Sequence, residues 1–291
     1  PIPGAGPNSR VTIKPATNKN VIIEGNSYAV IYFMNTSYLT LDGVGLTGAT
    51  TLTIHVIKNT QYLWNDAVDF MNNSDHNVIQ NTIFINEDYS RSSTGPAFYP
   101  DFFAGSLFAP DNNLIQNNFI KKAGFAIYVS AENSPVKAIG NIIRGNIVGS
   151  ETDSLIGWGI QAQFTQNTII ENNIVQNVRR QGNPDIDIIH GINSYYGNGV
   201  VIRNNIVHNI HSNGVKGATG LLLSGGVGNV GTNNSVYNNM VYDIQSTSTL
   251  YNSRVAGIQI WYQNDPKIYF NTVNLSGFGT NKYGSAAFYI S

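Results

Sequence analysis

The densest group of ionisable residues in the sequence surrounds Asp185 and Asp187. On an extended backbone these two carboxylates point to the same side, about 6.5 Å apart, where they could divide the roles of acid and base or hold a cation. His190 follows in the same segment, and Lys216 and Arg254 stand in the equivalent segments one and two repeats later. Stacked repeats would bring these side chains together, so they are the candidate catalytic residues if the protein is an enzyme.

Two enzymatic reactions fit this set of residues, and so does a role without catalysis. A uronate lyase needs a base and a positive charge that neutralises the sugar carboxylate, and His190, Lys216 and Arg254 supply both kinds of group. A glycoside hydrolase needs two carboxylates flanking one bond, which Asp185 and Asp187 could provide. The non-catalytic interpretation is a solvated loop, because charged residues collect in loops and a Pro-Asp step commonly starts a turn.

A second set of residues could bind a ligand without reacting with it. Four segments begin with Gly and alternate in hydrophobicity, at residues 159–163, 191–195, 220–223 and 257–261. Because side chains alternate between the two faces of a strand, we expect a polar and aromatic row of candidate substrate-binding residues on the outer face: Tyr128, Gln161, Gln163, Asn193, Tyr195, Gln259 and Trp261. Aromatic faces stack on sugar rings and amides bond hydroxyls, so the row predicts a saccharide track, with a plain polar surface as the alternative.

The elements that position both sets of residues come from an internal repeat with the pattern apolar, variable, Asn, polar, apolar. Clear copies lie at residues 79–83, 115–119, 170–174, 202–206, 236–240 and 269–273, and looser copies at residues 40–44 and 143–147. Successive copies are 27 to 39 residues apart, and each is short and rich in apolar residues, mainly Ile and Val. A helical repeat keeps a near-constant period and long apolar stripes, so this pattern predicts strands joined by loops of variable length.

The predicted fold is an all-β, single-stranded parallel β-helix of about seven to nine coils. Each coil supplies a strand, a turn at Asn, a second strand and a variable loop, and coils stacked ~4.8 Å apart pair equivalent strands. Asn suits the turn because it tolerates the left-handed backbone conformation, and stacked Asn side chains can bond one another as a ladder. We expect a single domain over residues 1–291, with a long loop insertion at about residues 87–110.

Stretches such as residues 38–43 (YLTLDG) and 268–273 (IYFNTV) resemble the pectin-lyase-like right-handed parallel β-helix proteins. The sequence pattern is most similar to that of the Asn-rich cell-surface modules of bacteria that use type IX secretion. The resemblance implies a right-handed solenoid that is secreted or held at the bacterial cell surface. It says little about activity, because the same scaffold serves lyases, hydrolases, epimerases and adhesins. Residues 286–291 read as an inward-facing strand, so we expect a fragment of a longer protein with a further domain or a capping partner at this end.

Composition excludes several other functions. Only 11% of residues are charged and the formal net charge is −1, so the chain lacks the electrostatic field that gathers nucleic acid or anionic membranes. It has no cysteine, which excludes thiol catalysis and Cys-ligated zinc, and no apolar run that approaches the ~20 residues of a membrane span. No motif requires a cofactor or metal; calcium would suit clustered Asp and Asn oxygens, but no spacing specifies it.

The sequence therefore favours an extracellular, non-catalytic β-helix module whose polar and aromatic face binds a polysaccharide or a cell-surface glycan. The alternative is a carbohydrate-active enzyme, a polysaccharide lyase or glycoside hydrolase, that acts in the groove along the strand before each Asn turn. The two hypotheses differ in one requirement. The enzyme needs Asp185 or Asp187 and a basic residue to converge beside that strand face.

Overall fold

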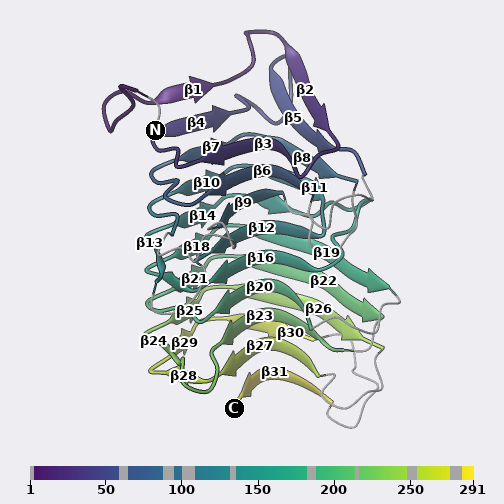
Figure 1. Cartoon of the computed structure of the whole chain (residues 1–291). Coiled ribbons are helices and arrows are strands. Elements are labelled where there is room, and N and C mark those ends of the chain that lie inside the picture. The colour runs from purple at the N-terminus through teal and green to yellow at the C-terminus, as the bar shows by residue number, and fades with distance from the viewer. Residues whose placement is uncertain are drawn as a thin grey trace.

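The computed structural model describes residues 3–58, 65–87, 95–99, 109–131, 136–181, 188–213, 216–247, 254–275 and 284–291. In these residues the regular structure consists of strands, and successive coils stack along one axis (Figure 1). No helix in this part of the chain is long and apolar enough to cross a membrane.

Three parallel sheets run along the solenoid, and each contains nine strands in the described part of the chain. The first sheet contains β1 (Val11–Ile13), β4 (Leu39–Asp42), β7 (Val78–Gln80), β10 (Leu114–Gln116), β14 (Ile142–Arg144), β18 (Ile169–Glu171), β21 (Val201–Arg203), β25 (Ser235–Tyr237) and β29 (Lys267–Tyr269). The second sheet contains β2 (Asn20–Gly25), β5 (Thr51–Val56), β8 (Ile83–Asn86), β11 (Phe119–Lys122), β15 (Ile147–Val148), β19 (Ile174–Gln181), β22 (Ile206–Asn213), β26 (Met240–Ser246) and β30 (Thr272–Asn274).

The third sheet contains β3 (Ala29–Met34), β6 (Asp66–Met71), β9 (Pro96–Tyr99), β12 (Phe125–Ser130), β16 (Trp158–Gln163), β20 (Ile189–Tyr195), β23 (Ala218–Ser224), β27 (Val255–Trp261) and β31 (Ser285–Ile290). Two short pairs lie beside the main sheets: β13 (Ala138–Ile139) with β17 (Thr165–Gln166), and β24 (Gly231–Thr232) with β28 (Gln263–Asn264). This topology confirms the predicted all-β parallel β-helix, within the expected range of about seven to nine coils. The range expected to be one long insertion, 87–110, contains β9, which adds a rung to the third sheet; residues 88–94 and 100–108 lie outside the described residues.

The core consists of columns of one aliphatic residue per coil. In the first sheet the column runs through Ile79, Ile115, Ile143, Ile170 and Ile202, all of them buried and in register. In the second sheet the equivalent column is mainly Val. A glycine column in the third sheet faces these valines: a Cβ at Gly191 would lie 2.3 Å from Val207 Cγ1, and Gly159, Gly220 and Gly257 are equally crowded. Glycine is therefore required there because the three sheets approach one another closely.

The turn between the first and second sheets contains two successive positions with different roles: the first sets the backbone conformation and the second forms hydrogen bonds in the interior. The first position adopts a left-handed backbone, with φ between 53° and 57° at Asn81, Asn117, Asn172, Asn204 and Asn238. Asn and Gly tolerate this conformation better than other residues. Gly145 and, in the last coil, Phe270 take the same position. The repeat copies centred on positions 42 and 271 are therefore displaced by one residue, because Asp42 pairs with Gln80 and Asn271 follows the left-handed residue.

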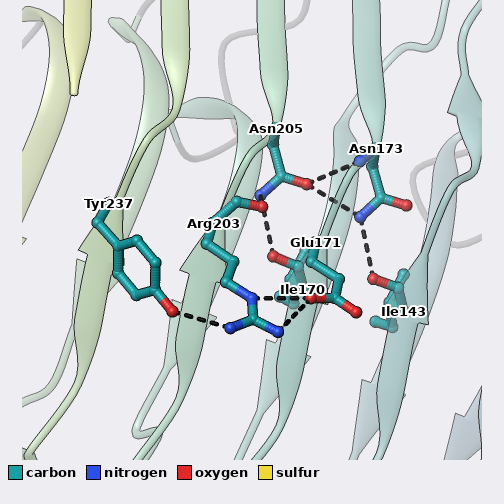
Figure 2. A network of polar contacts seen from close by, with 7 residues as sticks. All are labelled: Ile143, Ile170, Glu171, Asn173, Arg203, Asn205 and Tyr237. Atoms are coloured by element: carbon teal, nitrogen blue, oxygen red, sulfur yellow. Dashed lines mark hydrogen bonds and ion pairs between the residues drawn. The ribbon is translucent and has the colours of Figure 1, made fainter. Parts of the chain in front are cut away.

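The second position of this turn forms a buried column of asparagines. Asn205 Oδ1 accepts a hydrogen bond from the backbone N–H of Asn173 and a second from Asn173 Nδ2, both at 3.0 Å (Figure 2). Asn205 Nδ2 in turn donates to the Ile170 carbonyl at 2.9 Å. The same pattern joins the other members of the column: Asn118, Asn146, Asn239 and Asn271. From Asn118 to Asn239, the side-chain amides of this column are thus bonded along the axis.

A second asparagine column lies five residues earlier in each coil, at the corner between the third and first sheets. Asn77 Oδ1 accepts from the Leu39 N–H, and Asn113 Oδ1 accepts from the Asn77 N–H. Asn141 and Asn234 continue the arrangement in later coils. Thr168 and Val200 interrupt this column, which is why no simple repeat pattern reveals it.

A polar column runs over the outer face of the first sheet, parallel to the buried asparagines. Arg203 binds Glu171 with an Nη2 to Oε2 distance of 2.6 Å, and its Nη1 donates to the Tyr237 hydroxyl at 3.0 Å (Figure 2). Earlier coils continue the column through Gln116 and Gln80, joined at 2.7 Å. These contacts tie successive coils together on the surface as the asparagines do inside.

Candidate functional site

The outer face of the third sheet carries the predicted substrate-binding residues, and the strand register aligns them in two columns. The central column contains Tyr128, Gln161, Asn193, Leu222, Gln259 and Tyr289. The second column, which we call the exit column because it lies where these strands end, contains Ser130, Gln163, Tyr195, Ser224 and Trp261. The alignment of these outward positions is as the period-2 alternation predicts.

The amide side chains of the central column are buried, although they point away from the core. Gln161 is 3%, Asn193 5% and Gln259 1% exposed. Their polar atoms are largely used within the protein: Gln161 Nε2 donates to Gln163 Oε1 at 3.0 Å, and the Thr219 hydroxyl donates to Gln259 Oε1 at 2.8 Å. Burial also raises the pKa of the Tyr128 hydroxyl. The amide side chains of the column are therefore buried in this structure, whereas Tyr128 and Tyr289 are partly exposed, and the predicted contact of the column with substrate stays a prediction.

The exit column is half-buried and continues into a group of aromatic side chains. The rings of Tyr195 and Tyr196 lie 3.9 Å apart and their hydroxyls are joined at 2.8 Å. Phe164 stacks on Tyr196 at 4.8 Å between ring centroids. Tyr262, next in sequence to Trp261, is 52% exposed. We call this surface the exit edge: Gln163, Phe164, Tyr195, Tyr196, Trp261 and Tyr262.

Three aromatic residues of the exit edge have a backbone conformation that disfavours bulky side chains. Phe164, Tyr196 and Tyr262 have φ of 49°, 55° and 48°. A left-handed conformation is uncommon for residues other than Gly, Asn and Asp, and costs roughly 1 to 2 kcal/mol. Such strain persists at positions where the side chain itself is needed, so these aromatic rings are candidates for a role in binding.

One cation lies against the exit edge. Lys137 Nζ donates to the Tyr196 carbonyl at 2.7 Å and sits 5.5 Å from the centroid of the Phe164 ring. Burial lowers the pKa of this ammonium group. These contacts hold the aromatic rings in place. The positive charge of Lys137 interacts with the Tyr196 carbonyl and the Phe164 ring.

The residues predicted to be catalytic are only partly within the described chain. Asp185 and Asp187 lie outside the described residues. His190 is buried on the outer face of β20, in register with Trp158, and their rings are 6.0 Å apart. Lys216 precedes β23, and its carbonyl accepts a hydrogen bond from the Ser212 hydroxyl at 2.6 Å. The convergence that the enzyme hypothesis requires stays a prediction.

Arg254, the fifth predicted catalytic residue, contacts a tyrosine of the central column. Its guanidinium carbon lies 3.4 Å from the centroid of the Tyr289 ring. Hydrogen bonding to Arg254, and further to Ser291, lowers the pKa of the Tyr289 hydroxyl. This pair is a cation–π contact on the outer face of the third sheet. In the described part of the chain no group of three or more His, Asp or Glu side chains has the geometry of a metal site.

Sequence patterns did not identify Phe164 and Tyr196 as functional residues. The period-2 alternation ends with Gln163 and Tyr195, and the next residue belongs to a corner rather than a strand. The left-handed backbone of Phe164 and Tyr196 is informative only once the corner has been located.

Comparison with known proteins finds structural likeness alone. No protein-family model matches the chain, and no curated protein matches it in sequence. The solved structures found to be similar are pectin-lyase-like right-handed parallel β-helix proteins. The alginate lyase of Paenibacillus sp. str. FPU-7 is similar, with 15% identity, a TM-score of 0.48, and 93% of this chain and 84% of that chain covered.

Two further solved structures show the same likeness. The mannuronan C-5 epimerase AlgE6 A-module of Azotobacter vinelandii is 13% identical, with a TM-score of 0.42 and coverage of 99% of this chain and 91% of that chain. A DFA-IIIase mutant of Arthrobacter chlorophenolicus A6 in complex with DFA-III is 10% identical, with a TM-score of 0.46 and coverage of 90% and 75%. At these identities the likeness concerns the fold alone.

Proposed function

We propose that this protein is an extracellular, non-catalytic β-helix module that binds a polysaccharide or cell-surface glycan along the outer face of the third sheet. Contact is made at the exit edge. The module is secreted or held at the bacterial cell surface, and it forms one solenoid domain over residues 1–291. The proposal rests on one observation: half-exposed aromatic rings lie beside amide side chains on an otherwise weakly charged surface.

The chemistry of the exit edge suits a sugar polymer. Aromatic faces such as that of Trp261 pack against the C–H face of a pyranose ring, and the amide of Gln163 and the hydroxyl of Tyr195 bond to hydroxyl groups. Residues of the exit column succeed one another about 4.8 Å apart, so an extended polymer parallel to the axis would meet one side chain of the column at each coil. Rigid aromatic contacts limit the entropy lost on binding.

The enzyme alternative retains one supporting feature. His190 lies on the same outer face as the central column and is in register with Trp158, so a base is present beside the track. Its partners in catalysis would be Asp185 or Asp187. This alternative predicts turnover as well as binding.

A glycan array of neutral and acidic oligosaccharides, read with the wild-type chain, tests the proposal. Trp261→Ala and Tyr196→Asn are expected to weaken binding at least tenfold, because each removes one aromatic face from the exit edge. Tyr242→Ala is the control, since this tyrosine stacks on His208 on the second sheet, away from the exit edge. Absence of binding by the wild type, or equal binding by all variants, would contradict the proposal.

An absorbance assay for the double bond of unsaturated uronates, run on the same acidic oligosaccharides, separates the module from a lyase. Release of reducing ends does the same for a hydrolase. The proposed module binds and leaves its ligand unchanged. Turnover that is lost in Asp185→Asn or Asp187→Asn would establish the enzyme instead.

A further inference from the structure

The last described Asn turn has an aromatic residue where the other coils have Asn or Gly. Phe270 has φ of 55°, within a few degrees of Asn238 and Asn204 at the same position. Its side chain is 82% exposed, so it adds little to the core. A bulky residue in the left-handed conformation bears a steric cost that Asn largely avoids. Folding therefore does not explain this residue.

Two tyrosines beside Phe270 complete an aromatic surface. Tyr237 and Tyr269 are in register on the outer face of the first sheet, and their rings stack in parallel at 4.9 Å with an angle of 5°. Phe270 meets Tyr269 edge-on, with centroids 5.5 Å apart at 89°. We call these three residues the corner patch.

Polar groups border the corner patch on the side of the earlier coils. The exposed amides of Asn204 and Asn238 precede Phe270 in the same corner column. The Tyr237 hydroxyl accepts a hydrogen bond from Arg203 Nη1, and the charge of Arg203 is balanced by Glu171 (Figure 2). An apolar ring flanked by amides and hydroxyls, with the nearby ionic charges paired, suits a neutral sugar.

We propose that the corner patch is a second glycan-binding site, with neutral pyranose rings as its ligand class. It lies at the corner between the first and second sheets, whereas the exit edge lies at the end of the third-sheet strands. The two sites therefore engage different stretches of polymer or different chains. Two sites on one rigid scaffold raise the avidity for a dense glycan surface without any new contact at either site.

The decisive variant is Phe270→Asn. It introduces the residue type that the two preceding coils have at the equivalent position, namely Asn204 and Asn238. Because it removes the steric cost, the urea midpoint of unfolding is expected to stay the same or rise. Binding to densely printed neutral oligosaccharides on the array is expected to fall at least tenfold. A structural role for the ring predicts the opposite stability result, so a lower midpoint with unchanged binding overturns the proposal.

A double variant separates the two sites. Trp261→Ala disables the exit edge, and Phe270→Asn in that background is expected to abolish the remaining binding to neutral oligosaccharides. If Phe270→Asn has no effect in either background, the corner patch is not a site, while the exit edge stands on the effect of Trp261→Ala. If Phe270→Asn alone abolishes binding and Trp261→Ala has no effect, the corner patch stands and the exit edge does not. A wild-type chain that binds no neutral oligosaccharide overturns the corner patch.

Discussion

Residues at several corners of this solenoid share a left-handed backbone conformation, and the type of side chain decides whether that conformation is favourable. Asn172 and Asn204 adopt left-handed conformations at little cost and leave their side chains exposed. Phe164, Tyr196 and Phe270 adopt the same conformation with bulky rings, which is unfavourable. With Tyr262, four such residues lie in the exit edge or the corner patch, whereas Tyr38, Val44 and His76 adopt the same conformation elsewhere. At the two proposed sites the cost is as expected where a side chain is kept for binding.

Two aspartates at another corner give a pH-dependent contribution to stability. Burial raises the pKa of Asp111, and the neighbouring charge of Asp75 raises it further. Burial likewise raises the pKa of Asp75. A raised folded-state pKa means that the folded state binds more protons than the unfolded state just above the ordinary value of 3.8, so stability falls as pH rises through this window.

Asp111→Asn removes the charge and keeps Oδ1 as acceptor for the Ile139 N–H, which it binds at 2.7 Å. We expect a higher urea midpoint than wild type near neutral pH and no difference below the ordinary Asp pKa of 3.8. Unfolding curves at both pH values measure this. Asp265→Asn, at an exposed corner, is the control. A lower midpoint for Asp111→Asn near neutral pH would show that the ionised carboxylate stabilises the fold.

At the scale of elements, the buried asparagine column decides how coils stack, because it satisfies backbone groups that the turn leaves unpaired. Asn205→Ala removes the acceptor of the Asn173 N–H and the donor to the Ile170 carbonyl. Burying such groups without partners costs about 1 to 3 kcal/mol each, so we expect a loss of about 3 kcal/mol in the free energy of unfolding. Urea unfolding followed by circular dichroism gives the value.

Asn204→Gly is the matched control for this variant, since Asn204 is the exposed left-handed neighbour and Gly accepts the same backbone conformation. Its effect is expected to stay within about 0.5 kcal/mol. Equal losses in both variants would mean that the turn conformation, rather than the buried amide, holds the coils together.

The strands and their alignment could be predicted from the sequence because each coil repeats a short apolar pattern with an Asn at its turn. The period-2 alternation also placed Gln161, Asn193 and Gln259 correctly in one outward column. It could not show that this column is buried, since burial depends on how distant segments pack. The aromatic rings of Phe164 and Tyr196 were missed because they occupy corners, where neither the strand alternation nor the Asn pattern applies.

At the scale of the whole molecule, neutral contacts repeat along the axis and ionic contacts are few. The buried asparagines, the core columns and the stacked rings carry no net charge, and the chain as a whole has a formal net charge of −1. The ion pairs between described residues include Lys122 with Glu87 and Arg203 with Glu171. Stability and ligand binding should therefore depend little on ionic strength.

Raising sodium chloride from about 0.05 M to about 0.5 M shortens the screening length severalfold and weakens exposed charge pairs. For this chain we expect the urea midpoint to change little and the array signal for neutral oligosaccharides to change less than about twofold, because sugar stacking and amide bonds involve no net charge. Titrations on the array at both salt concentrations test this. A tenfold loss at high salt would mean that the ligand is held by charge, and would favour an acidic polymer over a neutral one.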